Sequence, residues 1–133
     1  MEFNLEVGLT AEAQELVSQE NTAKKYGSGS IEVYATPAMV GLMENASLKA
    51  VDPKLPEGYS TVGIHLDVSH LAATPIGMNV IAKATLEAID NKKLTFKVEA
   101  FDDQEKIGEG THTRYIIQID KFLQRAKNKK ANA

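Results

Sequence analysis

The stretch Thr36-Pro-Ala-Met-Val-Gly-Leu-Met-Glu-Asn-Ala-Ser-Leu-Lys-Ala-Val51 predicts a helix around which the rest of the chain must be arranged. Thr36 is expected at the N-cap, and Pro37 suits the first helical position, where its missing N–H would be unpaired anyway. Asp52-Pro53 then ends the helix predicted over 38–51. Because this helix is apolar on most sides, we expect it to be buried on most sides.

Four strand patterns follow this helix, separated by the turn signals Asp90-Asn91 and Asp102-Asp103-Gln104. Consecutive strands joined by short turns are typical of an antiparallel sheet. In the first pattern the even-numbered residues from Val62 to Val68 form an apolar face, and in the third we expect Leu94, Phe96, Val98 and Ala100 to point inward. The four predicted strands are Ser60–Leu71, Met78–Ile89, Leu94–Asp102 and Ile107–Ile119.

The segment before the helix is less regular. Residues 2–7 alternate weakly and could form a strand, and residues 11–23 are helical or irregular. Residues 26–30 form a loop, which has too few glycines to be a phosphate-binding loop. The order is therefore a strand, a loop-rich segment, one buried helix and four antiparallel strands. This order predicts an α+β architecture of the hot-dog type, with an antiparallel β-sheet wrapped around one central α-helix. A small wrapped sheet leaves a free edge, so we expect a homodimer.

Composition limits the function classes. The chain has 133 residues, which predicts a single domain over 1–133. The net charge of −3 argues against an overall positive electrostatic field that would attract nucleic acid. The basic tail over 121–133 is expected to be a solvated last helix, and a phosphate contact from the start of this tail is the functional alternative. There is no cysteine, no secretory signal pattern and no apolar run long enough for a membrane span, so a cytoplasmic location is expected.

Three residues break their local patterns. Glu44 is the only charged residue between Ala38 and Leu48, and a buried carboxylate is costly unless it is paired. It is either a structural carboxylate with a partner or a general base or nucleophile. His70 falls on the apolar face of its strand and His65 on the other, so the two should not bind one metal, and no metal site is expected.

Thr36 is the third of these residues, since its hydroxyl or the helix N-terminus could act on a substrate carbonyl. Thr36 and Glu44 are separated by about 12 Å along a helix. If both serve one site, that site is expected to be shared across a dimer interface.

Three runs closely resemble the fluoroacetyl-CoA thioesterase-like family of hot-dog enzymes. They are Val33-Tyr-Ala-Thr-Pro-Ala-Met-Val-Gly-Leu-Met-Glu-Asn-Ala46, Thr61-Val-Gly-Ile-His-Leu-Asp-Val-Ser-His-Leu-Ala-Ala-Thr-Pro-Ile-Gly77 and Ile107-Gly-Glu-Gly-Thr-His-Thr-Arg114. The similarity extends over most of the chain in the same order, and the combination of the first two runs is specific.

This resemblance implies a homodimeric enzyme that hydrolyses acyl-CoA thioesters, with coenzyme A entering only as part of the substrate. The family's catalytic Thr, Glu and His correspond to Thr36, Glu44 and His70, and a glycine near the substrate carbonyl corresponds to Gly63. His112 and Arg114 are candidate substrate contacts, Arg114 to the acyl or CoA portion. The family's phenylalanine lid falls on residues 27–30, which contain no aromatic residue, so the acyl group stays open.

The function predicted from the sequence is therefore hydrolysis of a small acyl-CoA thioester by direct water attack or through an acyl-enzyme. One alternative is a non-catalytic acyl-CoA or small-ligand binding protein on the same fold. Hydration or dehydration of an enoyl thioester is a further alternative, which the Thr-Glu-His set disfavours. No nucleic-acid or membrane partner is expected.

Overall fold

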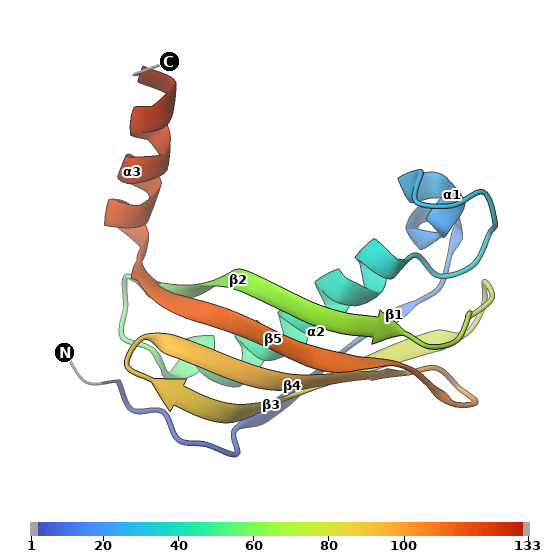
Figure 1. The fold of residues 1–133 in the computed structure, drawn as a ribbon, viewed down its shortest axis with the longest axis horizontal. Helices are drawn as coiled ribbons and strands as arrows, with labels where there is room; N and C mark the ends of the chain where they lie inside the picture. Colours follow the sequence, from blue (N-terminus) through green and yellow to red (C-terminus); the bar gives the residue numbers. More distant parts are fainter. Residues whose placement is uncertain (1–2, 132–133) are drawn as a thin grey trace.

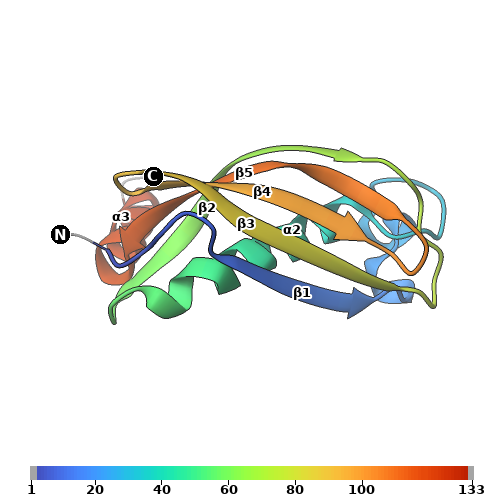
Figure 2. The same ribbon diagram turned by 90° about the horizontal axis from the view of Figure 1, so that it is seen from below.

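The computed structural model describes residues 3–131 and has one long helix enclosed by a curved sheet (Figures 1 and 2). Helix α2 (Thr36–Val51) extends by two residues at its start the helix predicted from the sequence. The sheet strands are β1 (Thr10–Leu16), β2 (Tyr59–His70), β3 (Asn79–Asp90), β4 (Lys93–Phe101) and β5 (Lys106–Gln118). The smaller elements are η1 (Gln19–Asn21), α1 (Ala23–Tyr26), η2 (Asp52–Lys54) and the C-terminal helix α3 (Ile119–Ala131).

The five strands form one antiparallel sheet in the order β1-β3-β4-β5-β2. This confirms the predicted sheet wrapped around a central helix. Strands β1 and β2 are its two edges, and α2 packs mainly against β1, β3 and β4. Seen from below, the sheet curves over α2 (Figure 2).

The core lies between α2 and the concave face of the sheet. All four residues predicted to point inward from β4 are fully buried there: Leu94, Phe96, Val98 and Ala100. The helix contributes Met39, Met43 and Ala46, which are also fully buried. The alternation of apolar and polar residues in β4 predicts its inward side chains correctly, because one face of this strand packs against the helix and the other contacts solvent.

The N-terminal prediction was wrong. The first strand is not at residues 2–7 but at Thr10–Leu16, and all but its first residue falls in the stretch 11–23 predicted to be helical or irregular; residues 1–2 lie outside the described part of the chain. Alanines conceal this strand, because Ala11 and Ala13 lie opposite Ala84 and Ala82 of β3 where α2 passes. Small side chains let helix and sheet approach, but they carry little β-propensity.

Strand β2 departs from simple alternation. Its register shifts between Gly63 and His65, so Val62 lies opposite the exposed Tyr115 whereas Leu66 lies opposite the buried His112. Residues directly opposite in an antiparallel pair share a face, so the predicted single apolar face from 62 to 70 is wrong. The bulge turns Leu66, Val68 and His70 toward the helix, and His65 is exposed as predicted.

Helix α3 confirms that the basic tail is helical up to residue 131, the last residue described. It stands away from the sheet, and none of its described residues is buried (Figure 1). No helix within residues 3–131 is both long enough and apolar enough to cross a membrane.

We predict opposite effects of alanine at two glycines. At Gly110 a Cβ would lie 2.1 Å from the Asp67 carbonyl oxygen and 2.6 Å from the Val68 Cα, and neither backbone atom can move without opening the β2–β5 pairing. Gly110→Ala should therefore lower the free energy of unfolding by about 3 kcal/mol. Gly41→Ala is the control, because no atom beyond its chain neighbours and the backbone of its own helix lies within 4 Å of its Cβ position.

In the middle of α2, Gly41→Ala should raise the free energy of unfolding by about 1 kcal/mol, through helix propensity. Urea denaturation followed by circular dichroism measures both values. Equal stability of the two variants would contradict the assigned β2–β5 contact.

Candidate active site

The first half of the site joins the start of α2 to the end of β2. The Thr36 hydroxyl lies 2.7 Å from His70 Nδ1, within hydrogen-bond distance. The β2 bulge turns His70 toward the helix, and its Nε2 is buried without a hydrogen-bond partner among the described residues. Burial lowers the pKa of His70 below the usual 6.5, so the neutral ring, which can accept a proton, predominates at pH 7.

Thr36 is not the N-cap of α2, contrary to the prediction. The helix begins at Thr36 itself, and Ala35 takes the extended N-cap conformation with no side-chain cap. A residue before proline usually avoids helical geometry, but Thr36 adopts it here. As a result its hydroxyl is not used to cap the helix and instead contacts His70.

A cavity of about 360 Å³ opens beside the Thr36–His70 pair. Its other lining residues come from α1, the following loop and the segment after β2: Ala23, Ser28, Val33, Tyr34, Leu71, Ala72 and Ala73. Tyr34 is almost fully buried, and its hydroxyl donates to the Glu15 carboxylate, so this ring is a fixed part of the wall. Burial, reinforced by the neighbouring Glu15, raises the pKa of Tyr34.

The second half of the site lies further along α2. Glu44 is half-buried, and a Cβ on Gly63 would come within 2.9 Å of its Oε2 and 3.0 Å of the His112 Cε1. The absence of a side chain at Gly63 therefore leaves the space in which the Glu44 carboxylate meets β2 and β5. Glu44, Gly63 and His112, selected from the sequence, are brought together within one protomer.

His112 is held in one protonation state by its partners. Its Nδ1 lies 2.8 Å from the His65 carbonyl oxygen, which can only accept, so Nδ1 carries the proton. Its Nε2 then accepts from Arg114 Nη1 at 3.2 Å. Burial, and the charge of Arg114 in addition, lower the pKa of His112. The ring is therefore neutral and fixed in orientation.

Arg114 is a buried cation, 5% exposed, whose guanidinium is oriented by Thr61. Its Nε donates to the Thr61 hydroxyl and its Nη2 to the Thr61 carbonyl oxygen, both at 2.8 Å. The Thr61 hydroxyl in turn donates to Asp52 Oδ1 at 2.7 Å. Burial lowers the pKa of Arg114, and the negative charges of Asp52 and Glu44 oppose this effect.

The sequence reading missed Asp52 and Thr61. The sequence pattern indicates only that Asp52 ends the helix, yet its carboxylate also accepts from the Ser60 hydroxyl at 2.6 Å. A negative side chain at a helix C-terminus opposes the helix dipole, which was a signal that it has another partner. Thr61 gave no signal, because its inward direction depends on the β2 bulge.

The two halves do not meet in one protomer. Thr36 and Glu44 lie on the same helix, which separates them by about 12 Å along its axis. Within the described chain, Thr36 pairs with His70, while Glu44 lies beside Gly63 and His112. The structure thus groups the predicted residues into two clusters on the same helical element.

We predict that Asp52→Asn destabilises the protein by removing the charge that faces Arg114 through Thr61. The expected loss is about 2 kcal/mol in the free energy of unfolding, because the buried Arg114 loses one of its two compensating negative charges and retains only that of Glu44. Asp90→Asn, at the exposed last residue of β3, is the control and should change little. Urea unfolding tests both; an unchanged midpoint in Asp52→Asn would show that this chain of contacts contributes no stability.

We also predict that His70 titrates below pH 6.5 in the folded protein, because burial disfavours its charged form. Since the unfolded chain takes up this proton first as the pH falls, the His70 contribution lowers the free energy of unfolding below pH 6.5. NMR titration of the ring protons, with the urea-unfolded protein as reference, measures both pKa values. A folded value at or above the unfolded one would contradict the burial argument.

Comparison with known proteins identifies the family of this chain. A family model described as fluoroacetyl-CoA-specific thioesterase matches residues 17–120. The fluoroacetyl-CoA thioesterase of Streptantibioticus cattleyicolor is 41% identical over 98 residues, covering 74% of this chain and 70% of that protein.

Solved structures give the same result. The fluoroacetyl-CoA thioesterase FlK superposes with a TM-score of 0.88 at 34% identity, covering 95% of this chain and 98% of that one. A thioesterase superfamily member from Thermus thermophilus superposes with a TM-score of 0.86 at 29% identity, covering 96% and 97%. The site clusters lie inside the matched region, and the chain belongs to the fluoroacetyl-CoA-specific thioesterase family.

Proposed function

We propose that this protein hydrolyses a small acyl-CoA thioester to the free acid and CoA. The observation that carries the proposal is the Thr36–His70 pair, 2.7 Å apart, beside a cavity of about 360 Å³. A hydroxyl next to a neutral imidazole is a unit that can attack a carbonyl or orient water for attack. Family membership and the thioesterase relatives support the same reaction class.

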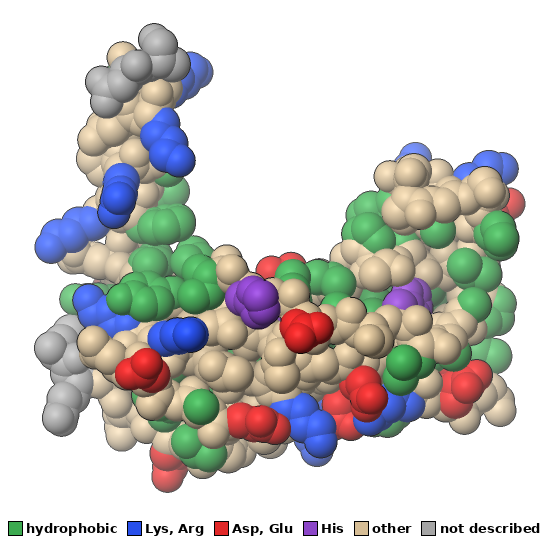
Figure 3. Space-filling model, in the orientation of Figure 1, with side chains coloured by type: hydrophobic (Ala, Val, Ile, Leu, Met, Phe, Trp, Pro, Cys, Tyr) green, Lys and Arg blue, Asp and Glu red, His purple; other side chains and the backbone are tan. Residues whose placement is uncertain are grey.

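We further propose that the working unit is a homodimer formed by antiparallel pairing of β2 with its copy. β2 is a twelve-residue edge strand, and it carries the exposed side chains of Ile64 and Leu66. A long apolar edge is a template for pairing with another strand. The edge lies in the hollow between α3 and α1, where a second subunit would fit (Figure 3).

This dimer would complete the site. A two-fold axis across β2 turns the start of one strand toward the end of the other, so the Glu44–Gly63 cluster of one protomer approaches the Thr36–His70 pair of its partner. Separation of the two clusters within one protomer supports this arrangement. The proposed site therefore takes one cluster from each subunit.

In the proposed reaction, the thioester carbonyl lies between the two clusters. Water or the Thr36 hydroxyl attacks the carbonyl carbon, and His70 accepts the proton released. The C–S bond breaks, and the proton passes to the departing thiolate of CoA. Glu44 acts as the base for water or as a transient covalent partner. Where the acyl group is first transferred to the Thr36 hydroxyl or the Glu44 carboxylate, water then cleaves that ester or anhydride, which releases the free acid and restores the side chain. Backbone N–H groups at the start of α2 and at Gly63 are the candidate oxyanion donors.

The acyl group is small on this proposal, and its identity is open. The family's phenylalanine lid has no counterpart at residues 27–30, and Tyr34 is fixed in the wall by Glu15. Fluoroacetyl, small aliphatic and aromatic acyl groups are therefore all substrates to be tested.

Release of free CoA from a panel of acyl-CoAs, including acetyl- and fluoroacetyl-CoA, tests the function. Glu44→Gln should lower kcat/KM by about 100-fold or more, the usual effect of losing a general base. Glu87→Gln, at an exposed position on β3, removes the same charge and should keep wild-type activity. Binding of acyl-CoA with no turnover of any member of the panel would favour the non-catalytic binding protein instead.

Mixing two inactive variants tests the shared site. A heterodimer of Thr36→Val and Glu44→Gln subunits contains one site with both substitutions and one unaltered site, if each site takes Thr36 and Glu44 from different subunits. Such a heterodimer should recover about half the wild-type activity, because two-fold symmetry gives each dimer two equivalent sites. If both residues act within one subunit, each site keeps one defect and no activity returns.

A further inference from the structure

A second cavity lies at the foot of α3, outside both clusters of the site. It has a volume of about 310 Å³ and is lined by Tyr59, Lys92, Tyr115, Ile116, Ile117, Gln118, Lys121, Phe122 and Arg125. Three of these side chains are cationic and three are aromatic. Apolar side chains gather at the foot of α3 with basic ones beside them (Figure 3).

The charge of this cavity is uncompensated. None of its lining residues is acidic, and in residues 3–131 none of Lys92, Lys121 and Arg125 takes part in an ion pair. The chain as a whole carries a net charge of −3, so three unpaired cations around one cavity run against its overall balance. Such a group attracts an anion.

The cavity is also fixed in place, although α3 itself stands away from the sheet. The Ile119 N–H donates to the Gly58 carbonyl oxygen at 2.9 Å, which ties the foot of the helix to the turn before β2. Lys121 and Arg125 are four residues apart and so lie on the same helix face. That face and the Phe122 ring border the cavity together with Tyr59 and Tyr115.

We propose that this cavity binds the nucleotide end of coenzyme A, the 3′-phosphorylated adenosine diphosphate, and so holds the substrate of the proposed thioesterase. The aromatic side chains offer faces for stacking of the adenine ring, and the Lys and Arg side chains bind the phosphate oxygens. This inference rests on the proposed function for its ligand. It adds a binding site that is separate from the reacting groups.

The cavity of one protomer serves the Thr36–His70 pair of the other. Tyr59 and His70 are the first and last residues of β2, so about 35 Å separates them at the usual rise per residue. This exceeds the reach of the pantetheine arm. Antiparallel pairing of β2 with its copy instead places Tyr59 of one strand at the His70 end of the other, which brings the cavity near the proposed reaction centre.

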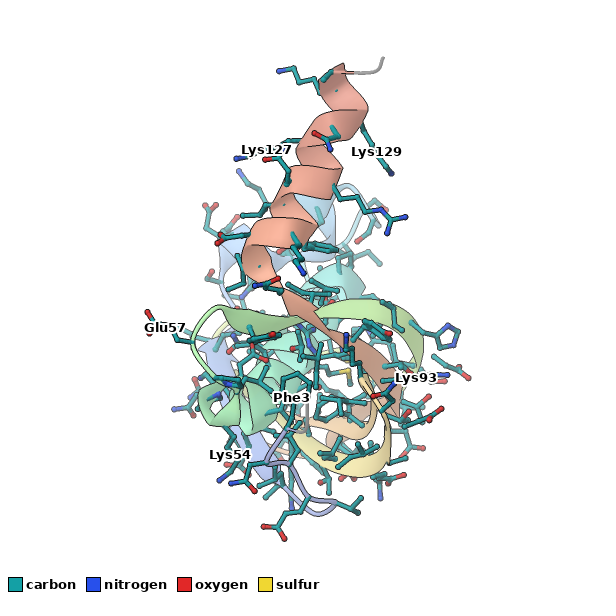
Figure 4. The ribbon with its side chains drawn as sticks, turned by 90° about the vertical axis from the view of Figure 1, so that its left-hand side faces the viewer. Phe3, Lys54, Glu57, Lys93, Lys127 and Lys129 are labelled. Carbon is teal, nitrogen blue, oxygen red and sulfur yellow. The ribbon has the colours of Figure 1, made fainter. Side chains whose placement is uncertain are left out.

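Binding of free CoA to a double variant tests the cavity without requiring turnover. Lys121→Ala with Arg125→Ala should raise the Kd for CoA by about tenfold or more in calorimetry, because two charge-assisted contacts are lost. The matched control is Lys127→Ala with Lys129→Ala, which removes the same charge nearer the free end of α3 (Figure 4). Its Kd should stay within about twofold of wild type, since these exposed charges do not line the cavity and are screened by salt.

Truncated ligands identify which part of CoA occupies the cavity. Adenosine 3′,5′-bisphosphate should bind the wild type and lose affinity in the Lys121/Arg125 variant, whereas pantetheine should bind both proteins equally. Dephospho-CoA should bind the wild type more weakly than CoA does, and this difference should shrink in the variant. Equal affinity of the wild type for CoA and dephospho-CoA would overturn the assignment of the 3′-phosphate to this cavity.

Two further outcomes would overturn the proposal. Equal losses of CoA affinity in the two double variants would show that CoA responds to the overall positive charge of α3 and not to the cavity. A loss of dimer in sedimentation, with CoA affinity unchanged, would show that the partner subunit covers the cavity. If CoA and the bisphosphate bind as expected while no acyl-CoA is hydrolysed, the nucleotide-binding role of the cavity is supported and the proposed thioesterase activity is contradicted.

Discussion

Enclosure of α2 is the constraint on which the rest of this structure depends. The helix buries residues on most of its circumference, among them Met39, Met43 and Ala46, and in this protein the curved sheet covers them. Small residues make the close approach possible: Ala13 on β1 and Ala82 on β3 are paired beneath it. Both clusters of the candidate site are attached to this helix, so its burial also sets their spacing.

A network of hydrogen-bonded polar side chains also lies between the helix and the sheet. Asp52, Thr61, Arg114 and His112 are connected by hydrogen bonds whose directions are set by donors and acceptors, which leaves His112 neutral beside Glu44. Burying a cation is costly unless it is hydrogen-bonded, and here each of the three guanidinium nitrogens has one partner: a hydroxyl, a ring nitrogen and a carbonyl. This hydrogen-bond network therefore connects the end of α2 to the groups around Gly63.

Three incomplete features of the protomer lie along β2. The strand has an unpaired apolar edge, the two site clusters contact its middle and its end, and the cationic cavity adjoins its start at Tyr59. Each would be completed by one second copy of the chain placed across this edge. The proposed interface would thus account for the exposed edge, the separation of the two clusters and the distance of the charged cavity, which is why the dimer is central to the proposed function.

The sequence by itself determined the buried helix, the antiparallel order of the four later strands and the family, because long periodic patterns and specific motifs are local properties of the chain. It also singled out Thr36, Glu44 and His70, since each interrupts such a pattern. Only the tertiary structure decided that β1 is a strand, because its alanines are selected by the approach of α2. The tertiary structure likewise decided, through the β2 bulge, which residues of β2 face the helix. It also paired the Thr36 hydroxyl with His70 and not with the start of its own helix, because contacts between distant segments outweigh local preference.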